Sequence, residues 1–198
     1  MQNRWNEKDA TGATTDLDLR AYSSRLIGSD TALVLHGGGN TSVKSTHQDR
    51  FGEDQDIIFV KASGFDLASM GPEGFTALDL PHLLKLAQLD QLSDPDMVNE
   101  VLRARLDAGA AAASIEAIVH ALIPFKFVDH SHADAILTIS NTPGGRNRFA
   151  EIFGDRVLVV PYVKPGFDLA IQFRDIMRDN DMSKYEAVIS ENHGIFTF

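Results

Sequence analysis

Short apolar segments typical of strands are mixed along this chain with amphipathic segments typical of helices. The two kinds do not follow the regular strand, helix, strand order that builds a parallel sheet. We therefore predict an α/β domain whose central sheet is mostly antiparallel or mixed and is flanked by helices. The predicted strands are 32–35, 41–44, 56–61, 126–132, 157–160, 187–189 and 195–198, and the predicted helices are 16–28, 81–92, 96–107, 115–123 and 167–177.

The composition excludes several classes of protein. A length of 198 residues suits one large domain, and the absence of cysteine excludes disulfides and thiolate metal sites. A net charge of -10 argues against a nucleic-acid partner and means that an anionic substrate needs a local positive site. No long apolar run and no signal-peptide core are present, so we expect a cytoplasmic protein that does not enter a membrane. The chain ends in a predicted strand soon after His193, so we expect it to be truncated or part of a longer protein.

Two histidines stand one residue apart in the segment FVDHSHADA. In a strand, His130 and His132 project from the same face and can meet one metal ion, whereas in a helix they point apart. Phe127 and Val128 favour the strand. His193, in the segment ENHG, can supply a third imidazole, and three imidazoles with an open position describe a catalytic zinc site. The alternative is that these are ordinary polar residues at a strand end.

Glycine turns offer candidate anion sites. In HGGGNTS, Gly39 and Asn40 belong to a turn whose backbone can approach a ligand closely. Ser63 and Gly64 form a second turn, and Ser114 is expected to be the N-cap of the helix 115–123, where the helix dipole favours anions. Each turn is also consistent with a plain hairpin. Neither matches the spacing of a nucleotide-binding motif.

The motifs GGGNTSVK, KASG, SIEAIVHALIPFKFVDHSHADA, VVPYVKPGFDLA and ENHG occur in an order that resembles the class II aldolase and adducin head-domain family. The resemblance covers nearly the whole chain. It is strongest to the aldolase portion of bifunctional rhamnulose-1-phosphate aldolase and dehydrogenase proteins. It implies a three-layer domain with a central sheet between helices.

The resemblance also implies roles for individual residues. It points to His130, His132 and His193 as zinc ligands and to Glu116 as the proton-transfer group, although a first-turn carboxylate is also favoured by the helix dipole alone. It assigns the substrate phosphate to Gly39, Asn40, Ser63, Gly64 and Ser114. One departure weakens this assignment, because Ile115 stands where simpler sugar-phosphate aldolases have a second serine. No dinucleotide motif is present, so no dehydrogenase activity is assigned to these residues.

The leading hypothesis is a metal-dependent lyase that reversibly cleaves a ketose 1-phosphate, such as rhamnulose 1-phosphate, to dihydroxyacetone phosphate and an aldehyde. Zinc is the expected ion, and another divalent metal is the alternative. Epimerisation or decarboxylation at the same site, and an adducin-like binding module without chemistry, are the competing functions. The resemblance further implies a homo-oligomer, with a tetramer as the expected form. His120 either supports Glu116 or belongs to a plain polar patch, and Lys44 and Lys61 either assist the anion site or are solvated.

Overall fold

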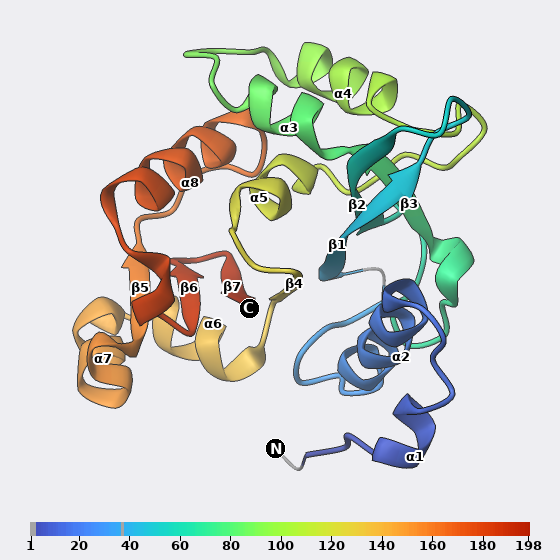
Figure 1. Ribbon diagram of the computed structural model, residues 1–198. Coiled ribbons are helices and arrows are strands. Elements are labelled where there is room, and N and C mark those ends of the chain that lie inside the picture. The colour runs from blue at the N-terminus through green and yellow to red at the C-terminus, as the bar shows by residue number, and fades with distance from the viewer. Residues whose placement is uncertain (1–2, 37) are drawn as a thin grey trace.

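One mixed sheet crosses the molecule in the computed structural model, which describes residues 3–36 and 38–198 (Figure 1). Its strand order is β3-β2-β1-β4-β7-β6-β5, and only the pair β5 and β6 is parallel among the described strands. The predicted mixed sheet is therefore confirmed. The strands are β1 (Asn40–Gln48), β2 (Asp54–Lys61), β3 (Phe75–Asp79), β4 (Phe127–Ser131), β5 (Val157–Val160), β6 (Ala187–Ser190) and β7 (Gly194–Thr197).

Helices cover both faces of the sheet and complete three layers. They are α1 (Glu7–Ala10), α2 (Asp16–Gly28), α3 (Leu80–Leu86), α4 (Asp94–Arg103), α5 (Ala117–Leu122), α6 (Asp134–Ser140), α7 (Gly145–Phe153) and α8 (Phe167–Asp179). The cluster that contains α3, α5 and α8 takes Ile58 and Val188 from the sheet, whereas Phe59 packs with α2 and Ile189 with α6 and α7. Because successive strand residues point to opposite faces, α2, α6 and α7 lie on the face opposite α5.

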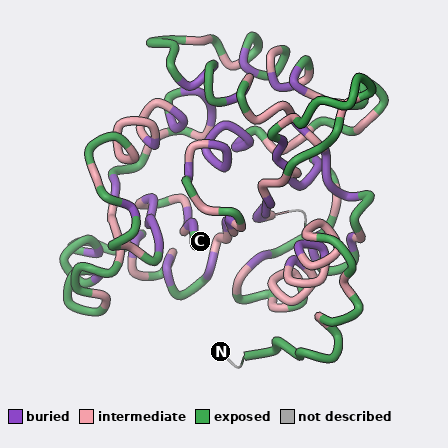
Figure 2. The backbone as a smooth tube through the Cα atoms, in the orientation of Figure 1, coloured by how far each residue is buried: buried purple, intermediate pink, exposed green. Residues whose placement is uncertain are grey.

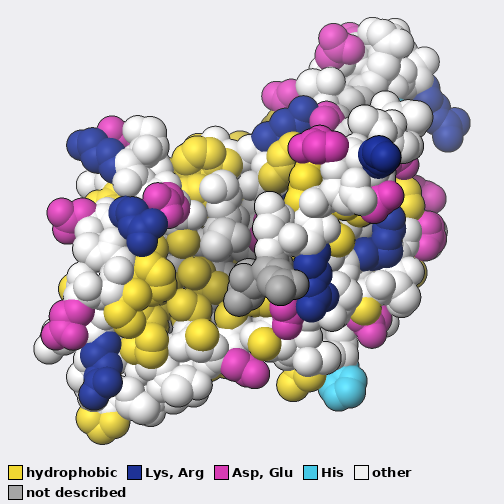
Figure 3. All heavy atoms as spheres, turned by 90° about the horizontal axis from the view of Figure 1, so that it is seen from below, with side chains coloured by type: hydrophobic (Ala, Val, Ile, Leu, Met, Phe, Trp, Pro, Cys, Tyr) yellow, Lys and Arg dark blue, Asp and Glu magenta, His cyan; other side chains and the backbone are white. Residues whose placement is uncertain are grey.

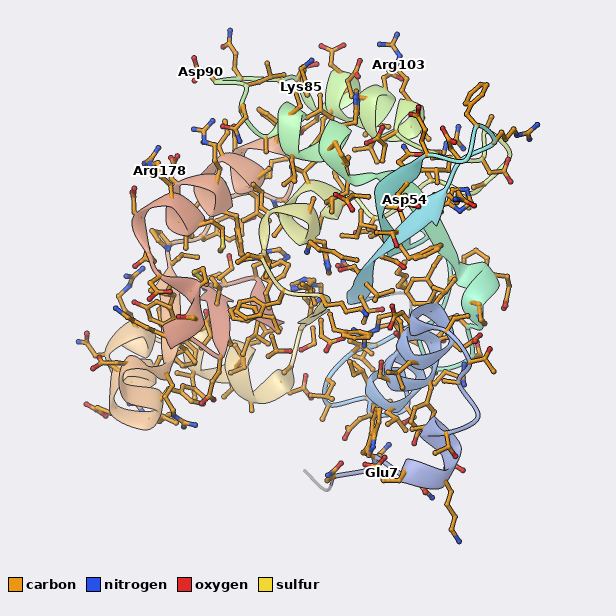
Figure 4. All side chains as sticks on the ribbon, viewed as in Figure 1. Glu7, Asp54, Lys85, Asp90, Arg103 and Arg178 are labelled. Atoms are coloured by element: carbon orange, nitrogen blue, oxygen red, sulfur yellow. The ribbon has the colours of Figure 1, made fainter. Side chains whose placement is uncertain are left out.

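Helix α5 is the most enclosed helix of the fold. Ala117 to Ala121 are buried, and Figure 2 shows this helix buried while α4 and α7 expose much of their surface. Charged side chains such as Lys85, Arg103 and Arg178 point outward at the periphery (Figure 4). No helix within residues 3–36 and 38–198 is long and apolar enough to cross a bilayer.

Several predicted elements are confirmed, and three predictions were wrong. Residues 32–35 form turns and irregular backbone and not a strand, although Val34 is buried. The helix predicted over 81–92 ends at Leu86, and Phe75–Asp79, for which no element was predicted, form strand β3. The helix predicted from residue 115 begins at Ala117, with Glu116 and not Ser114 as its N-cap. Gly37, within the predicted glycine turn, lies outside the described residues.

Candidate functional site

Three histidines from two segments of the chain meet at one end of the sheet. His130 lies in β4, His132 follows the same strand, and His193 lies in the tight turn between β6 and β7. Their ligand nitrogens all lie within 4.8 Å of one another, and Nε2 of His130 is 3.0 Å from Nε2 of His132. Asn192 adopts a φ of 57° in the turn, which brings His193 toward the strand pair. The predicted convergence of these three side chains therefore exists.

The environment of the histidines suits metal binding. Nδ1 of His130 is 3.2 Å from the carbonyl oxygen of Ile195, which can only accept, so Nδ1 carries the proton and Nε2 presents a lone pair to the cluster. A backbone carbonyl behind a metal-binding imidazole commonly fixes the ring in this way. Burial lowers the pKa of His130 to about 4 and also lowers the pKa of His132, so both rings are neutral at neutral pH. Neutral imidazoles without thiolates suit zinc or a similar divalent ion.

The carboxylate of Glu116 lies against this cluster. Glu116 is buried at the N-terminal end of α5, with Oε1 3.1 Å from Nε2 of His193 and Oε2 3.5 Å from Nε2 of His130. Burial raises the pKa of Glu116, but the charge that His130 carries at low pH, together with hydrogen bonds from His193 and Asn40, outweighs burial and holds the pKa well below its usual range. The group is therefore an anion at neutral pH and can accept a proton.

A buried polar chain continues behind Glu116. Nδ2 of Asn40 donates to Oε2 of Glu116 at 2.6 Å, Oδ1 of Asn40 contacts Nε2 of His120, and Nδ1 of His120 is 2.8 Å from the hydroxyl of Ser42. His120 is fully buried, which lowers its pKa to about 3. The structure therefore favours the hypothesis that His120 supports Glu116, through Asn40, over the alternative that it belongs to a plain polar patch. Asn40, expected at the phosphate, also holds Glu116.

The predicted anion-binding residues line a hollow of about 320 Å³ beside the histidines. Its lining includes all five predicted residues, Gly39, Asn40, Ser63, Gly64 and Ser114, together with Glu116, His132 and His193. The backbone N–H groups of Ser63 and Ser114 already donate to the carbonyls of Ala112 and Lys61, so these serines offer a ligand their hydroxyls and not their N–H groups. Ile115 also lines the hollow and is 45% exposed, which places an apolar side chain where the second serine is absent.

Glycine is required at position 39 by both conformation and space. Its φ is +65°, and a Cβ there would lie 2.5 Å from Cγ1 of Val34 and 2.9 Å from the carbonyl oxygen of His130. The turn therefore approaches β4 more closely than any side chain allows. This close approach sets Asn40 directly beside His130, its partner in the sheet.

The two lysines behave differently from a solvated lysine at a strand end. Lys61 is 3% exposed and lines the hollow, where it adds positive charge; burial lowers its pKa, and Asp66 opposes that change. Lys44 does not line the hollow. Its Nζ instead donates to the carbonyls of His120, Ile123 and Phe125 at 2.6 to 2.9 Å, at the C-terminal end of α5. Its suggested role at the anion site was therefore wrong, and Lys44 anchors the helix that carries Glu116.

The chain is similar in sequence to proteins of one family. A sequence model described as "Class II Aldolase and Adducin N-terminal domain" matches residues 19–198. The protein named "Uncharacterized oxidoreductase YuxG" from Bacillus subtilis (strain 168) is 37% identical over 198 residues, which are 100% of this chain and 28% of that protein. The chain thus spans little more than a quarter of that relative.

Solved structures show the same architecture. The N-terminal class II aldolase domain of a conserved protein from Thermoplasma acidophilum is 41% identical, with a TM-score of 0.90 over 100% of this chain and 89% of that chain. The structure of L-fuculose-1-phosphate aldolase from Thermus thermophilus is 18% identical, with a TM-score of 0.52 over 90% of this chain and 78% of that chain. At that lower identity the likeness concerns the fold.

Proposed function

Because this chain belongs to the class II aldolase and adducin family, we propose that it catalyses the metal-dependent, reversible aldol cleavage of a ketose 1-phosphate. The products are dihydroxyacetone phosphate and an aldehyde, and rhamnulose 1-phosphate is the first substrate to test. The observation that carries this proposal is the convergence of His130, His132 and His193 with the carboxylate of Glu116. A purely structural domain has no need for such a cluster beside an open hollow.

His130, His132 and His193 are the residues that would hold the metal, with zinc as the first candidate. Their spacing, the neutral state of His130 and the carbonyl behind its ring all fit that ion. A bound zinc ion supplies Lewis-acid polarisation of the substrate carbonyl. The protein supplies the remaining parts of the site.

Glu116 is the proposed catalytic base and acid. In the condensation direction its carboxylate takes a proton from the carbon next to the carbonyl of dihydroxyacetone phosphate, and in cleavage it returns that proton. Its low pKa keeps it ionised, and its place between the histidines and the hollow puts it near the reacting carbon. A positioned carboxylate of this kind typically contributes about 10²- to 10⁴-fold in rate.

The hollow is the proposed binding site of the substrate phosphate. Gly39, Ser63, Gly64 and Ser114 line it, and the buried Lys61 adds the local positive charge that an acidic protein needs to attract an anion. Fixing the phosphate there orients the reacting carbons toward Glu116. Asn40 contributes both to this hollow and to the carboxylate.

Two other functions remain as competing proposals. The same site can perform epimerisation or decarboxylation of a sugar phosphate, since both also need stabilised negative charge next to a carbonyl. A non-catalytic binding module, as in adducin, keeps the fold without the chemistry. The oxidoreductase name of the B. subtilis relative belongs to a protein of which this chain matches 28%, so we assign no redox step to these residues.

We further propose that residues 1–198 are one domain of a longer cytoplasmic protein that assembles as a homo-oligomer, with a tetramer as the expected form. A surface feature supports assembly: hydrophobic side chains gather on the side of the molecule where α6 and α7 lie (Figure 3). Ile152 of α7 is 54% exposed. Light scattering that finds only monomers would contradict this part of the proposal.

The function is tested by offering zinc-loaded protein a panel of ketose 1-phosphates and coupling the release of dihydroxyacetone phosphate to NADH oxidation. We expect the wild type to cleave at least one member, His130→Ala to lose both zinc and activity, and Glu116→Gln to keep zinc while activity falls about 10²- to 10⁴-fold. Zinc binding with epimerisation or decarboxylation but no cleavage would favour the sister activities. A folded protein that takes up no divalent metal would favour the binding module.

A further inference from the structure

Glu116 is held from behind by a chain of side chains that reach it from β1 and α5. The chain runs from Ser42 through His120 and Asn40 to Glu116, and none of the four is more than 7% exposed. His120 and Glu116 are four residues apart, which places them on the same face of the helix start. These hydrogen bonds are therefore largely shielded from water.

The direction of each hydrogen bond follows from the chemistry of the groups. An ionised carboxylate only accepts, so the Asn40 atom that faces Glu116 is Nδ2, and Oδ1 must face His120. Because Oδ1 also only accepts, Nε2 of His120 carries the proton. Burial keeps the ring neutral, with a pKa of about 3, so Nδ1 is unprotonated and accepts from the hydroxyl of Ser42.

We propose that His120 is a positioning residue for Glu116: its Nε2–H group fixes the Asn40 amide in the one orientation that donates to the carboxylate. This inference rests on the proposed function for its catalytic consequence. A rotated Asn40 amide would turn Oδ1 toward Glu116, where oxygen would face oxygen between two buried side chains. The Nε2–H donor of His120 excludes that orientation, because in the rotated amide this donor would face the Asn40 NH₂ group and find no acceptor.

The His120 ring is itself held in place, so it keeps the Asn40 amide in one orientation. Ser42 binds Nδ1, and the ring of Phe196 packs edge-on against the imidazole with centroids 5.9 Å apart. Asn40 also lines the substrate hollow. The chain thus couples the position of the base to the wall of the binding site, and a small displacement of a catalytic group can cost about 10²-fold in rate.

Two substitutions of similar polarity separate positioning from packing. In His120→Gln the side-chain amide extends about as far as Nε2 and keeps a donor for Asn40, whereas in His120→Asn it extends only about as far as Nδ1 and loses that donor. We expect His120→Asn to lower kcat about 10- to 100-fold with little change in KM, and His120→Gln to recover most of that loss. Both should bind stoichiometric zinc, because the three metal-binding histidines are untouched. His47→Asn, at an exposed site on β1, is the control.

A second measurement does not depend on activity. Proton–nitrogen NMR correlations of the His120 ring in metal-free wild-type protein should show the Nε2–H tautomer, and neutron crystal structures of the variants, which distinguish amide oxygen from nitrogen, should show the Asn40 amide turned in His120→Asn but not in His120→Gln. An Nδ1–H tautomer, or equal losses of kcat in two folded, zinc-loaded variants, would overturn the inference. If no ketose 1-phosphate is cleaved by the wild type, the proposed function fails, while tautomer and amide orientation still decide the role of His120.

Discussion

Replacing His132 by alanine is the sharpest test of the metal site. His132 is the most exposed of the three clustered histidines, since His130 is fully buried against Phe196 and the His193 side chain is 8% exposed. Its truncation therefore removes a ligand without opening a cavity in the core. The expected result is a folded protein that has lost most of its response to zinc.

The spacing of the three nitrogens fits a zinc ion, and the expected rise in Tm follows from the zinc concentration relative to Kd. A tetrahedral zinc ion with Zn–N bonds of about 2.0 to 2.1 Å holds two imidazole nitrogens about 3.3 Å apart. Nε2 of His130 and Nε2 of His132 are 3.0 Å apart and all three ligand nitrogens lie within 4.8 Å of one another, so small side-chain rotations would complete the site. Zinc at a hundred times its Kd stabilises the wild type by about 2.7 kcal/mol, a rise in Tm of about 5 to 10 °C for a chain of this size. If losing a ligand weakens binding about 100-fold, the rise falls to about 1 °C.

The assay is thermal unfolding of metal-free protein with and without zinc, together with the zinc content after dialysis. His47→Ala is the matched control, because it also removes one histidine from the unfolded chain but lies at an exposed position on β1. It should keep the full rise in Tm. A His132→Ala protein that still gained the wild-type stabilisation would refute the three-histidine site, as would a wild type with no response to zinc or any other divalent ion.

Two further predictions concern the stability of the protein and the buried groups around α5. Lys44→Met removes the Nζ donor from three carbonyls at the end of α5, and urea unfolding should show a loss of about 2 to 4 kcal/mol; an unchanged midpoint would contradict the anchoring role. In metal-free protein, burial holds the pKa of His120 at about 3 and that of His130 at about 4, below their ordinary value of 6.5. Between pH 6.5 and 5 the unfolded chain therefore binds more protons than the folded chain, and the free energy of unfolding falls as the pH falls. Each ring contributes up to about 1.4 kcal/mol per pH unit, and His120→Gln should remove one such contribution from the slope; an unchanged slope would show that His120 is not buried as a neutral ring.

The strands that carry the histidines could be predicted because their patterns are local. Phe127 and Val128 mark an apolar approach to the HxH pair, and strand periodicity alone then puts His130 and His132 on one side. The turn at His193 is equally visible between two short apolar runs. These inferences need only neighbouring residues, and the structure agrees with each of them.

The wrong predictions share a physical cause, which is that a partner distant in sequence decides the outcome. Strand β3 was not predicted, and Phe75–Asp79 form it by pairing with β2. Residues 32–35 are apolar enough for a strand, but Val34 is buried beside α2 and no strand within the described residues pairs with them. In the same way, the link from His120 to Asn40 spans 80 residues, and no local pattern reveals it.

The register of the central strands explains why the site depends on the whole sheet. Asn40 is the partner of His130 across β1 and β4, and His130 is the partner of Phe196 across β4 and β7. On β1, alternate residues share one face, so Asn40, Ser42 and Lys44 all point toward α5: the first binds Glu116, the second binds His120, and the third binds the carbonyls at the helix end. A slip of one residue would turn all three away from α5 and His130 away from the metal cluster. Correct pairing of β1 with β4 therefore assembles the base, its supporting chain and a metal ligand in a single step.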